Sequence, residues 1–260
     1  MRTLFVWERG YLILDDTVIP KPFVTAIEHL AWVYSSQERK PVYGLSLVLP
    51  IWTEGTVRIP LGMRLWHKGG SSKYALAIEL LSYARNRLRC RPEYVIFDAW
   101  YPSKALLKRT RDYGWYFICR LKKNRRFNNQ PLRTYRRHPY WAESGRLSGG
   151  LKVLVVRYGA KYYATNRLSL PAAEVRRLYR MRAQIEEVIR ACKNQLGFNG
   201  CQARSVRAQL HHLSCCLVAF CVLERERHDR GLTIYKLKHQ LSYQGRRLAL
   251  PALERLRQAA

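Results

Sequence analysis

The sequence is poor in acidic residues and has no long apolar run. Its 260 residues include 18 Asp and Glu against 47 Lys and Arg, which gives a formal net charge of +29. A charge balance this positive predicts a polyanionic partner, and nucleic acid is the first candidate, ahead of an anionic membrane surface. A transmembrane helix needs about 20 consecutive apolar residues. The longest apolar stretch, Leu213 to Leu223, is shorter and contains Ser214, so we expect no membrane-spanning segment.

Signals for export and for disulfide bonding are also missing. Residues 1–7 contain no apolar h-region and no small-residue cleavage site, so we expect no signal peptide. The seven cysteines are odd in number and irregularly spaced, which argues against a disulfide framework and indicates a reducing compartment. Hydrophobic residues make up 48% of the chain, enough to build a core. We therefore expect a folded cytoplasmic protein.

The chain is organised around a helix that we predict from about Ala172 to Leu196. This stretch contains no Pro or Gly and ends just before Gly197, as a helix does. At about 100° per residue, its apolar residues form one stripe: Leu178, Met181, Ile185, Ile189, Cys192 and Leu196. Beside the stripe, within roughly 60° of one another, lie four polar residues: Tyr179, Arg182, Glu186 and Lys193.

These four polar side chains admit two interpretations. A hydroxyl, a guanidinium, a carboxylate and an ammonium on one edge can hold a metal ion and a phosphate chain together. An ordinary solvated helix flank with charges at i,i+4 spacing fits the pattern equally well. The wheel turns the neighbouring carboxylate, Glu187, away from the group, which makes it a natural control residue.

Two apolar strands are each followed by aspartate. Residues 11–14 run up to Asp15 and Asp16, and residues 94–97 run up to Asp98. In α/β sheets, ligands collect at the carboxyl ends of the strands, so these carboxylates are candidate ligands. The alternatives are a turn or a helix cap that uses the Asp side chain. Alternation alone does not choose between Asp15 and Asp16.

The remaining segments complete an α/β order. Periodicity predicts strands over residues 42–49, 56–66 and 113–121, and helices over residues 73–88, 102–111 and 206–228. The last helix carries His and Cys at i,i+4 spacings (His211, His212, Cys215, Cys216). Zinc is conceivable there, but without a C-x-x-C pair a core helix is favoured. The tail after Gly231 is basic and polar, with a short helix-like run from Pro251.

Residues 122–166 differ in character because basic and aromatic residues alternate along them. Strand-like runs cover residues 152–157 and 161–165, so we predict a β-rich insertion. Basic and aromatic side chains together suit neutralisation of phosphates and stacking on unpaired bases. Trp141 is a candidate for stacking on a displaced base, although an aromatic side chain packed on a small sheet is the favoured interpretation.

The spacing of the helix residues resembles a family signature. Tyr179, two residues, Arg182, three residues, Glu186, six residues and Lys193 resemble the Y-R-E-K signature of insertion-sequence DDE transposases. The segments around Asp15 and Asp98 resemble those that carry the first two catalytic aspartates of that family, and we take Asp15 rather than Asp16 as the first.

The resemblance implies an RNase H-like fold, a mixed α/β sheet flanked by helices with the β-rich insertion before the Glu-bearing helix. It divides the chain into a first core segment (1–121), the insertion (122–166), a helical core segment (167–228) and a basic tail (229–260).

The resemblance also implies an enzyme, a metal-dependent DNA transposase. Asp15, Asp98 and Glu186 would be the catalytic metal ligands, and an all-oxygen set suits Mg²⁺ or Mn²⁺, two ions in this family. Arg182 and Lys193 would hold DNA phosphates, and Tyr179 would hydrogen-bond a phosphate or strand end. Water would cut at the transposon ends, and the freed 3′-hydroxyl would then attack target DNA. A homodimer and a nucleoid-associated, prokaryotic location are implied as well.

One departure from the family concerns the start of the chain. Members usually carry a DNA-binding domain before the first Asp, whereas fourteen residues precede Asp15 here, so we expect that domain to be missing. This leaves two alternatives to a catalytic transposase domain. One is a truncated, non-transposing DNA-binding remnant or regulator of a full-length transposase. The other is an RNase H-like nuclease without transfer activity.

Overall fold

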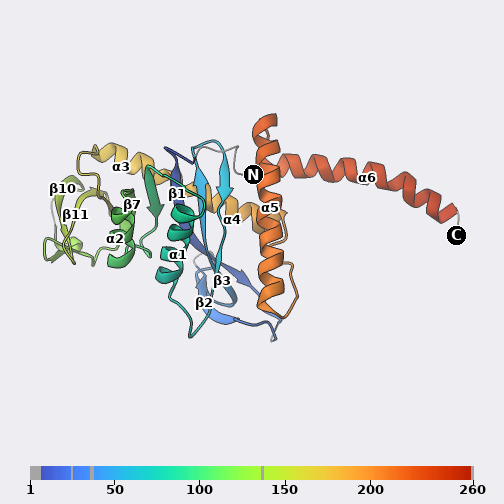
Figure 1. The fold of residues 1–260 in the computed structure, drawn as a ribbon, viewed down its shortest axis with the longest axis horizontal. Coiled ribbons are helices and arrows are strands. Elements are labelled where there is room, and N and C mark those ends of the chain that lie inside the picture. Colours follow the sequence, from blue (N-terminus) through green and yellow to red (C-terminus); the bar gives the residue numbers. More distant parts are fainter. Residues whose placement is uncertain (1–6, 25, 36–37, 136–137, 259–260) are drawn as a thin grey trace.

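The protein is described here from a computed structural model covering residues 7–24, 26–35, 38–135 and 138–258. Over these residues, twelve strands form one mixed sheet with helices on both faces (Figure 1). The strand order is β2-β3-β1-β6-β7-β12-β11-β10-β8-β9, and β4 and β5 also pair with β3. The strands are β1 (Tyr11–Pro20), β2 (Ala31–Ser35), β3 (Lys40–Thr53), β4 (Arg58–Pro60), β5 (Arg64–Trp66), β6 (Tyr94–Phe97), β7 (Tyr116–Leu121), β8 (Arg126–Phe127), β9 (Gln130–Pro131), β10 (Tyr140–Leu147), β11 (Leu151–Tyr158) and β12 (Lys161–Thr165).

The centre of the sheet combines antiparallel and parallel pairing. β1 is antiparallel to β3 and parallel to β6, and β6 is parallel to β7. All four residues of β6 are buried, as expected of a strand covered on both faces. The prediction that the first strand ends in the two carboxylates Asp15 and Asp16 is wrong, because β1 pairs with β3 as far as Pro20. Its parallel contact with β6, however, ends at Leu14.

Alternate residues of these strands face different helices. Leu12, Leu14 and Phe97 pack with α1 (Lys73–Asn86) and α2 (Lys104–Asp112). Ile13, Ile96 and Ile118 pack against the helices of the other face, which are α3 (Ala172–Tyr179), α4 (Ala183–Gln195) and α5 (Val206–Arg230). The position of a residue in its strand therefore decides which helices its side chain meets.

The predicted helix from Ala172 to Leu196 is interrupted, so a single helix is wrong. A 3₁₀ turn, η2 (Arg180–Arg182), separates α3 from α4. This turn contacts β1 and β6, and a tertiary contact of this kind is invisible to helical periodicity. The predicted stripe is buried at Leu178, Ile185 and Cys192, and the interruption places Arg182 over the sheet.

Other boundaries needed smaller corrections. The strand predicted over residues 56–66 is two short strands, β4 and β5. The strand predicted from Tyr113 begins at Tyr116, because Tyr113 is the C-cap of α2. Within the insertion, β11 and β12 were predicted and β10 was missed. The insertion extends the main sheet, since β12 pairs with β7.

The C-terminal part consists of two long helices. By length and mean hydropathy (1.5), α5 is apolar enough to cross a membrane. One face of α5 nevertheless packs in the core through Leu213 and Phe220, and its buried Glu224 pairs with Arg58, so we assign it to the core. The predicted short run from Pro251 is part of α6 (Ile234–Gln258), which contains Pro251 and projects from the body (Figure 1).

Candidate active site

Three charged residues stand in a row where the parallel strands end. Leu14 pairs with Phe97 on β6, and Phe97 pairs with Cys119 on β7. The next residues of the three strands are Asp15, Asp98 and Arg120. In-register neighbours of parallel strands share a face. Each of the three residues comes two positions after an isoleucine that packs on the α4 side of the sheet, namely Ile13, Ile96 and Ile118. The two predicted carboxylates are therefore neighbours beneath α4.

Asp15 is buried, with only 7% of its surface exposed. One carboxylate oxygen, Oδ1, accepts a hydrogen bond from the Asp16 backbone N–H (3.0 Å), and the other, Oδ2, lies 2.6 Å from Nη2 of Arg182. Burial raises the pKa of Asp15 to about 7, and the charges of Asp98 and Asp16 act in the same direction while Arg182 opposes them. With Arg182 as its cationic partner, the Asp15 carboxyl group therefore exchanges its proton near neutral pH.

Asp16 faces the opposite side of the sheet. Its carboxylate forms an ion pair with Lys73 of α1 and accepts a hydrogen bond from the Tyr101 hydroxyl (3.2 Å). Asp15 and Asp16 thus have different partners on different faces, and only Asp15 shares a face with α4. This geometry places Asp15, and not Asp16, on the side of the sheet where Arg182 also pairs with Glu186.

Asp98 does not cap the following helix. Its Oδ1 accepts a hydrogen bond from the backbone N–H of Trp100 (2.8 Å), whereas the α2 cap is Ser103, whose hydroxyl accepts from the Leu106 N–H (3.2 Å). Burial raises the pKa of Asp98, opposed by this hydrogen bond and by Arg182. The carboxylate is half-buried, and a helix-cap role does not account for it.

Arg182 joins the sheet to α4. Its guanidinium pairs through Nη2 with Asp15 and through Nη1 with Glu186. Its Nε is buried and has no hydrogen-bond partner among the described residues. Burial acts to lower the pKa of Arg182, but the surrounding acidic groups, Asp15 first, raise it overall. A permanently charged cation thus lies between two of the three predicted carboxylates.

This cation determines how the acidic site (Asp15, Asp98 and Glu186) is arranged. In the part of the chain that the structure describes, no three His, Cys, Asp or Glu side chains converge to hold a metal ion as they stand. The guanidinium lies between Asp15 and Glu186 instead. The side chain of Glu186 is 47% exposed, so it lies at the outer rim of the site.

The other predicted site residues are distributed unequally. Tyr179 lies near Asp98 and Arg182, whose charges act on its hydroxyl. Its ring packs edge-on against Tyr163 at 5.0 Å between centroids. Burial, together with the charge of Asp98, raises the pKa of Tyr179, and Arg182 opposes this rise. Lys193 is two turns beyond Glu186, about 10 Å along the helix. Burial lowers its pKa, and the charge that opposes this is Glu38, outside the acidic site.

Trp141 is packed, as the favoured interpretation of the sequence held. Its ring lies within 6.5 Å, between centroids, of Phe127, Tyr135 and Tyr162. It belongs to the core on the α1 and α2 side of the sheet. A packed ring of this kind is poorly placed to stack on a base.

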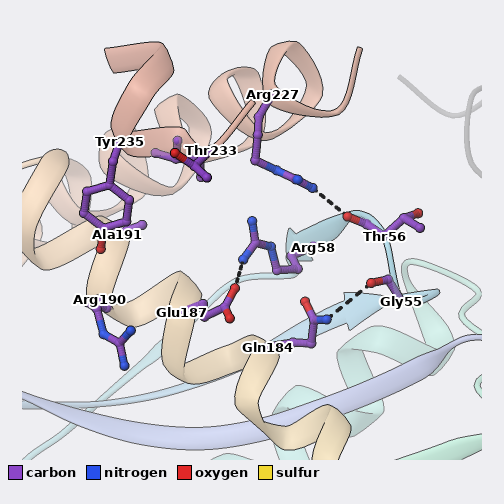
Figure 2. Close-up of a pocket in the computed structure, with 11 residues that line it drawn as sticks. Gly55, Thr56, Arg58, Gln184, Glu187, Arg190, Ala191, Arg227, Thr233 and Tyr235 are labelled. Atoms are coloured by element: carbon purple, nitrogen blue, oxygen red, sulfur yellow. Dashed lines mark hydrogen bonds and ion pairs between the residues drawn. The ribbon is translucent and has the colours of Figure 1, made fainter. Parts of the chain in front are cut away.

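The far side of α4 carries a separate pocket of about 380 Å³ (Figure 2). Glu187 points into it and pairs with Arg58, and Arg58 also pairs with the buried Glu224 of α5. Gln184 donates a hydrogen bond to the Gly55 carbonyl. The prediction that Glu187 turns away from the acidic site is confirmed, but its ion pair makes it a structural residue and a poor neutral control.

The sequence matches the family model described as "Transposase DDE domain" over residues 7–222. The chain belongs to the DDE transposase family. This transposase domain is also similar in fold to a solved cryo-EM structure of the piggyBac transposase in a synaptic complex with hairpin DNA. The TM-score is 0.61 at 13% identity, and the match covers 93% of this chain and 54% of that one. At this identity the likeness shows the fold alone, and it confirms the RNase H-like class.

The transposase domain therefore spans about half the length of the piggyBac transposase chain. A search of curated proteins gave no match.

Two residues of the transposase domain were missed at the sequence level. Arg120 completes the row with Asp15 and Asp98, and Trp100 lies in the loop that Asp98 anchors. A signal for Arg120 was present, because Ile118-x-Arg120 repeats the pattern of Ile-x-Asp that ends the other two parallel segments. Trp100 had no comparable signal, since only the structure separates its exposed ring from the buried ring of Tyr101.

Proposed function

We propose that Asp15, Asp98 and Glu186 bind divalent metal ions and that the domain cleaves and transfers DNA strands by phosphoryl transfer. The observation that carries the proposal is the double ion pair of Arg182 with Asp15 and Glu186. The Arg182 guanidinium lies between the sheet carboxylate and the helix carboxylate, which supports a site for positive charge there. We keep the division into core segments 1–121 and 167–228, the insertion and the tail as part of the proposal.

The donor set fits hard divalent ions. All three side chains offer carboxylate oxygens, the ligands that Mg²⁺ and Mn²⁺ prefer. Burial raises the pKa values of Asp15 and Asp98, and nearby carboxylates add to this: Asp98 and Asp16 at Asp15, and Asp16 at Asp98. Raised pKa values of this kind are typical of carboxylates that lack sufficient positive charge nearby. Metal ions would supply that charge, and two of them are the family's expected complement.

Bound ions would activate the attacking oxygen and stabilise the leaving oxygen of an in-line displacement at phosphorus. Asp15 and Asp98 would hold their side of the site rigidly, because Asp15 lies on β1 and Asp98 directly follows β6, the strand paired with it. Glu186 closes the site from α4. Arg182, released from the carboxylates, binds a DNA phosphate bidentately, with Tyr179 beside it and Lys193 further along the backbone.

The substrates we propose are the ends of a transposable element and target DNA. Water is the first nucleophile, at the element's end, and the freed 3′-hydroxyl is the second. A net charge of +29 suits a protein that neutralises DNA phosphates. A homodimer on two DNA ends and a cytoplasmic, nucleoid-associated location complete the proposal.

The test is nicking of supercoiled plasmid by the purified chain with Mg²⁺ or Mn²⁺. We expect activity, and we expect Glu186→Gln to lower its rate at least about a hundredfold, or about 2.7 kcal/mol in activation free energy, while DNA binding persists. The matched control is Glu226→Gln, which removes an exposed helix carboxylate paired only with Arg230 among the described contacts.

The outcomes separate the possible functions. Equal nicking by wild type and Glu186→Gln would reject the three-carboxylate site. Salt-sensitive DNA binding without any nicking would replace the enzyme by a DNA-binding regulator. Nicking without joining of 3′-hydroxyl ends to target DNA would leave a nuclease.

A further inference from the structure

We propose that the open edge of β2 pairs with the same strand of a second copy of the chain, so that two sheets join across a two-fold axis at Val33. The two strands run antiparallel, with Trp32 opposite Tyr34 of the partner subunit. The proposal builds on the homodimer of the proposed function, names the surface that forms it and requires no DNA.

The two ends of the sheet are protected differently. The strand order ends in β2 on one side and in β9 on the other. Strand β9 is two residues long and includes Pro131, and both features protect an edge from further pairing. Strand β2 has five residues, none of them charged and none proline. In the described part of the chain its pairing is with β3, so its outer edge is open to another strand.

This edge presents the backbone groups of two aromatic residues. Tyr43, which pairs with Trp32, accepts a hydrogen bond on its other side from the Lys21 N–H (2.9 Å). Pro41, which pairs with Tyr34, has no N–H to donate. Both pairs are therefore of the kind without hydrogen bonds between the two strands. It follows that the N–H and C=O groups of Trp32 and Tyr34 point to the open edge.

The strand is complementary to its own reverse. An antiparallel two-fold axis at Val33 sets Trp32 opposite Tyr34 of the partner subunit, where the outward N–H and C=O groups of both can exchange hydrogen bonds. Two aromatic rings meet in each of these pairs, a favourable combination across strands. Beyond them, the axis sets Ala31 opposite Ser35 of the partner subunit, so small residues meet at the ends. One surface thus serves both copies, as an isologous contact requires.

The charge of this region favours a second copy over nucleic acid. Residues 22–38 contain two Glu but no Lys or Arg, in a chain with a net charge of +29. Two such basic chains repel each other, and the repulsion is least where basic side chains are missing. Lys40 lies beside this region, but its ammonium faces Glu38 (3.9 Å). DNA, in contrast, needs basic side chains at its contact surface.

Exposed aromatic surface sets the strength of the contact. Trp32 and Tyr34 are 71% and 61% exposed, and a groove of about 540 Å³ beside Trp32 is lined largely by apolar residues such as Pro22 and Tyr43. An aromatic side chain buries about 150–250 Å², so four rings supply up to about half of the roughly 1,200–2,000 Å² of a standard interface. We therefore expect a dimer that dissociates on dilution in the micromolar range.

Sedimentation equilibrium of the full chain, in EDTA and without DNA, measures this association over roughly 1–100 μM. We expect the mass to rise from 30.6 kDa toward twice that value. Trp32→Lys combined with Tyr34→Lys should weaken the association at least about tenfold, because like charges then stand opposite each other in both pairs. The matched control is Tyr140→Lys combined with Tyr243→Lys, which adds the same charge at exposed aromatic positions of β10 and α6. It should leave the association unchanged.

Cysteine cross-linking tests the register. Val33→Cys should form a disulfide between subunits under mild oxidation, because its two copies meet on the axis with Cα atoms about 4.5 Å apart, within the range of a disulfide. Ala31→Cys lies on the same face of the strand, but its two copies are about 13 Å apart, so it should not cross-link. Wild type, with the exposed Cys215, gives the background.

Three results would overturn the pairing. They are a mass that stays at 30.6 kDa over the whole concentration range, equal weakening in the control pair of lysines, and equal cross-linking at positions 31 and 33. If the variant with lysines on β2 does not fold by circular dichroism, the comparison of Val33→Cys with Ala31→Cys decides.

Failure of the pairing differs from failure of the proposed activity. Glu186→Gln should associate as wild type does, because it lies outside β2. Association through β2 in a protein that does not nick would support the pairing and reject the activity. Nicking by a chain that stays monomeric over the same range would do the reverse.

Discussion

Asp15 carries an electrostatic cost that the fold does not relieve. It lies under α4 beside Asp98, and Arg182 offsets only part of the burial, so its pKa is about 7 against an ordinary value of 3.8. Between these values the folded protein keeps a proton that the unfolded chain releases. Raising the pH through this window therefore favours unfolding.

The first prediction concerns this window in metal-free protein. From pH 5 to pH 8, Asp15 should lower the free energy of unfolding by roughly 2–3 kcal/mol, with the loss complete above pH 7. Asp15→Asn removes the titrating group, so its stability relative to wild type should increase by that amount over the same range. Urea unfolding in EDTA at both pH values measures it. The control is Asp229→Asn, at an exposed position of α5, whose unfolding free energy should change with pH as that of wild type does. If the unfolding free energy of Asp15→Asn also followed wild type across this range, the raised pKa of Asp15 would be wrong.

At the scale of elements, one buried ion cluster fastens β4 to α4 and α5. Glu224, 1% exposed, accepts hydrogen bonds from the Arg58 backbone N–H (3.1 Å) and from its Nε (2.7 Å) and Nη2 (2.8 Å). Arg58 pairs in addition with Glu187 of α4. The helix that bears Glu186 is thus held from its far side, away from the acidic site.

Glu224→Ala should therefore destabilise the fold by about 3–5 kcal/mol, because it leaves the Arg58 charge buried without its main partner. Chemical denaturation at pH 7 measures the change. The comparison variant is Glu226→Ala on the exposed face of the same helix, for which we expect less than about 1 kcal/mol. Similar losses in the two variants would show that the cluster does not fasten these elements.

The sequence predicted those elements whose cause is local. Residues 94–97 are wholly apolar because the strand is covered on both faces. Asp98 is recognisable in the sequence because it is the charged residue that ends this apolar run. The break at Arg180–Arg182 and the Arg58–Glu224 pair, 166 residues apart, depend on contacts between distant segments. Local periodicity contains no trace of them, which is why the helix was predicted whole and the supporting cluster was missed.

At the scale of the whole molecule, charge dominates. With a net charge of +29, the affinity for DNA should fall steeply as salt is raised. For each phosphate contact, the logarithm of the affinity should fall by about 0.9 units per tenfold increase in salt concentration. In the proposed function, Arg182 would join these phosphate contacts only after it leaves Asp15 and Glu186, so we expect its contribution to require a divalent ion in the acidic site.

With Ca²⁺ present, Arg182→Ala should weaken DNA binding and flatten the dependence of log affinity on log salt by about one unit. Titrations at several salt concentrations give the slope. Arg91→Ala, an exposed arginine before β6 at the opposite end of the strand from Asp98, is the control and should leave the slope unchanged. A slope that Arg182→Ala does not alter would reject the phosphate role.

The pairing of β12 with β7 limits how this domain can be shortened. Strand β7 pairs with β6 through residues Tyr116–Cys119 on one side and with β12 through residues Ile118–Leu121 on the other. Excision of the insertion would turn β7 into an open edge strand, whose free N–H and C=O groups recruit other chains and promote aggregation. A compact relative of this domain would need a different guard for that edge, such as a proline, an inward-pointing lysine or a covering helix.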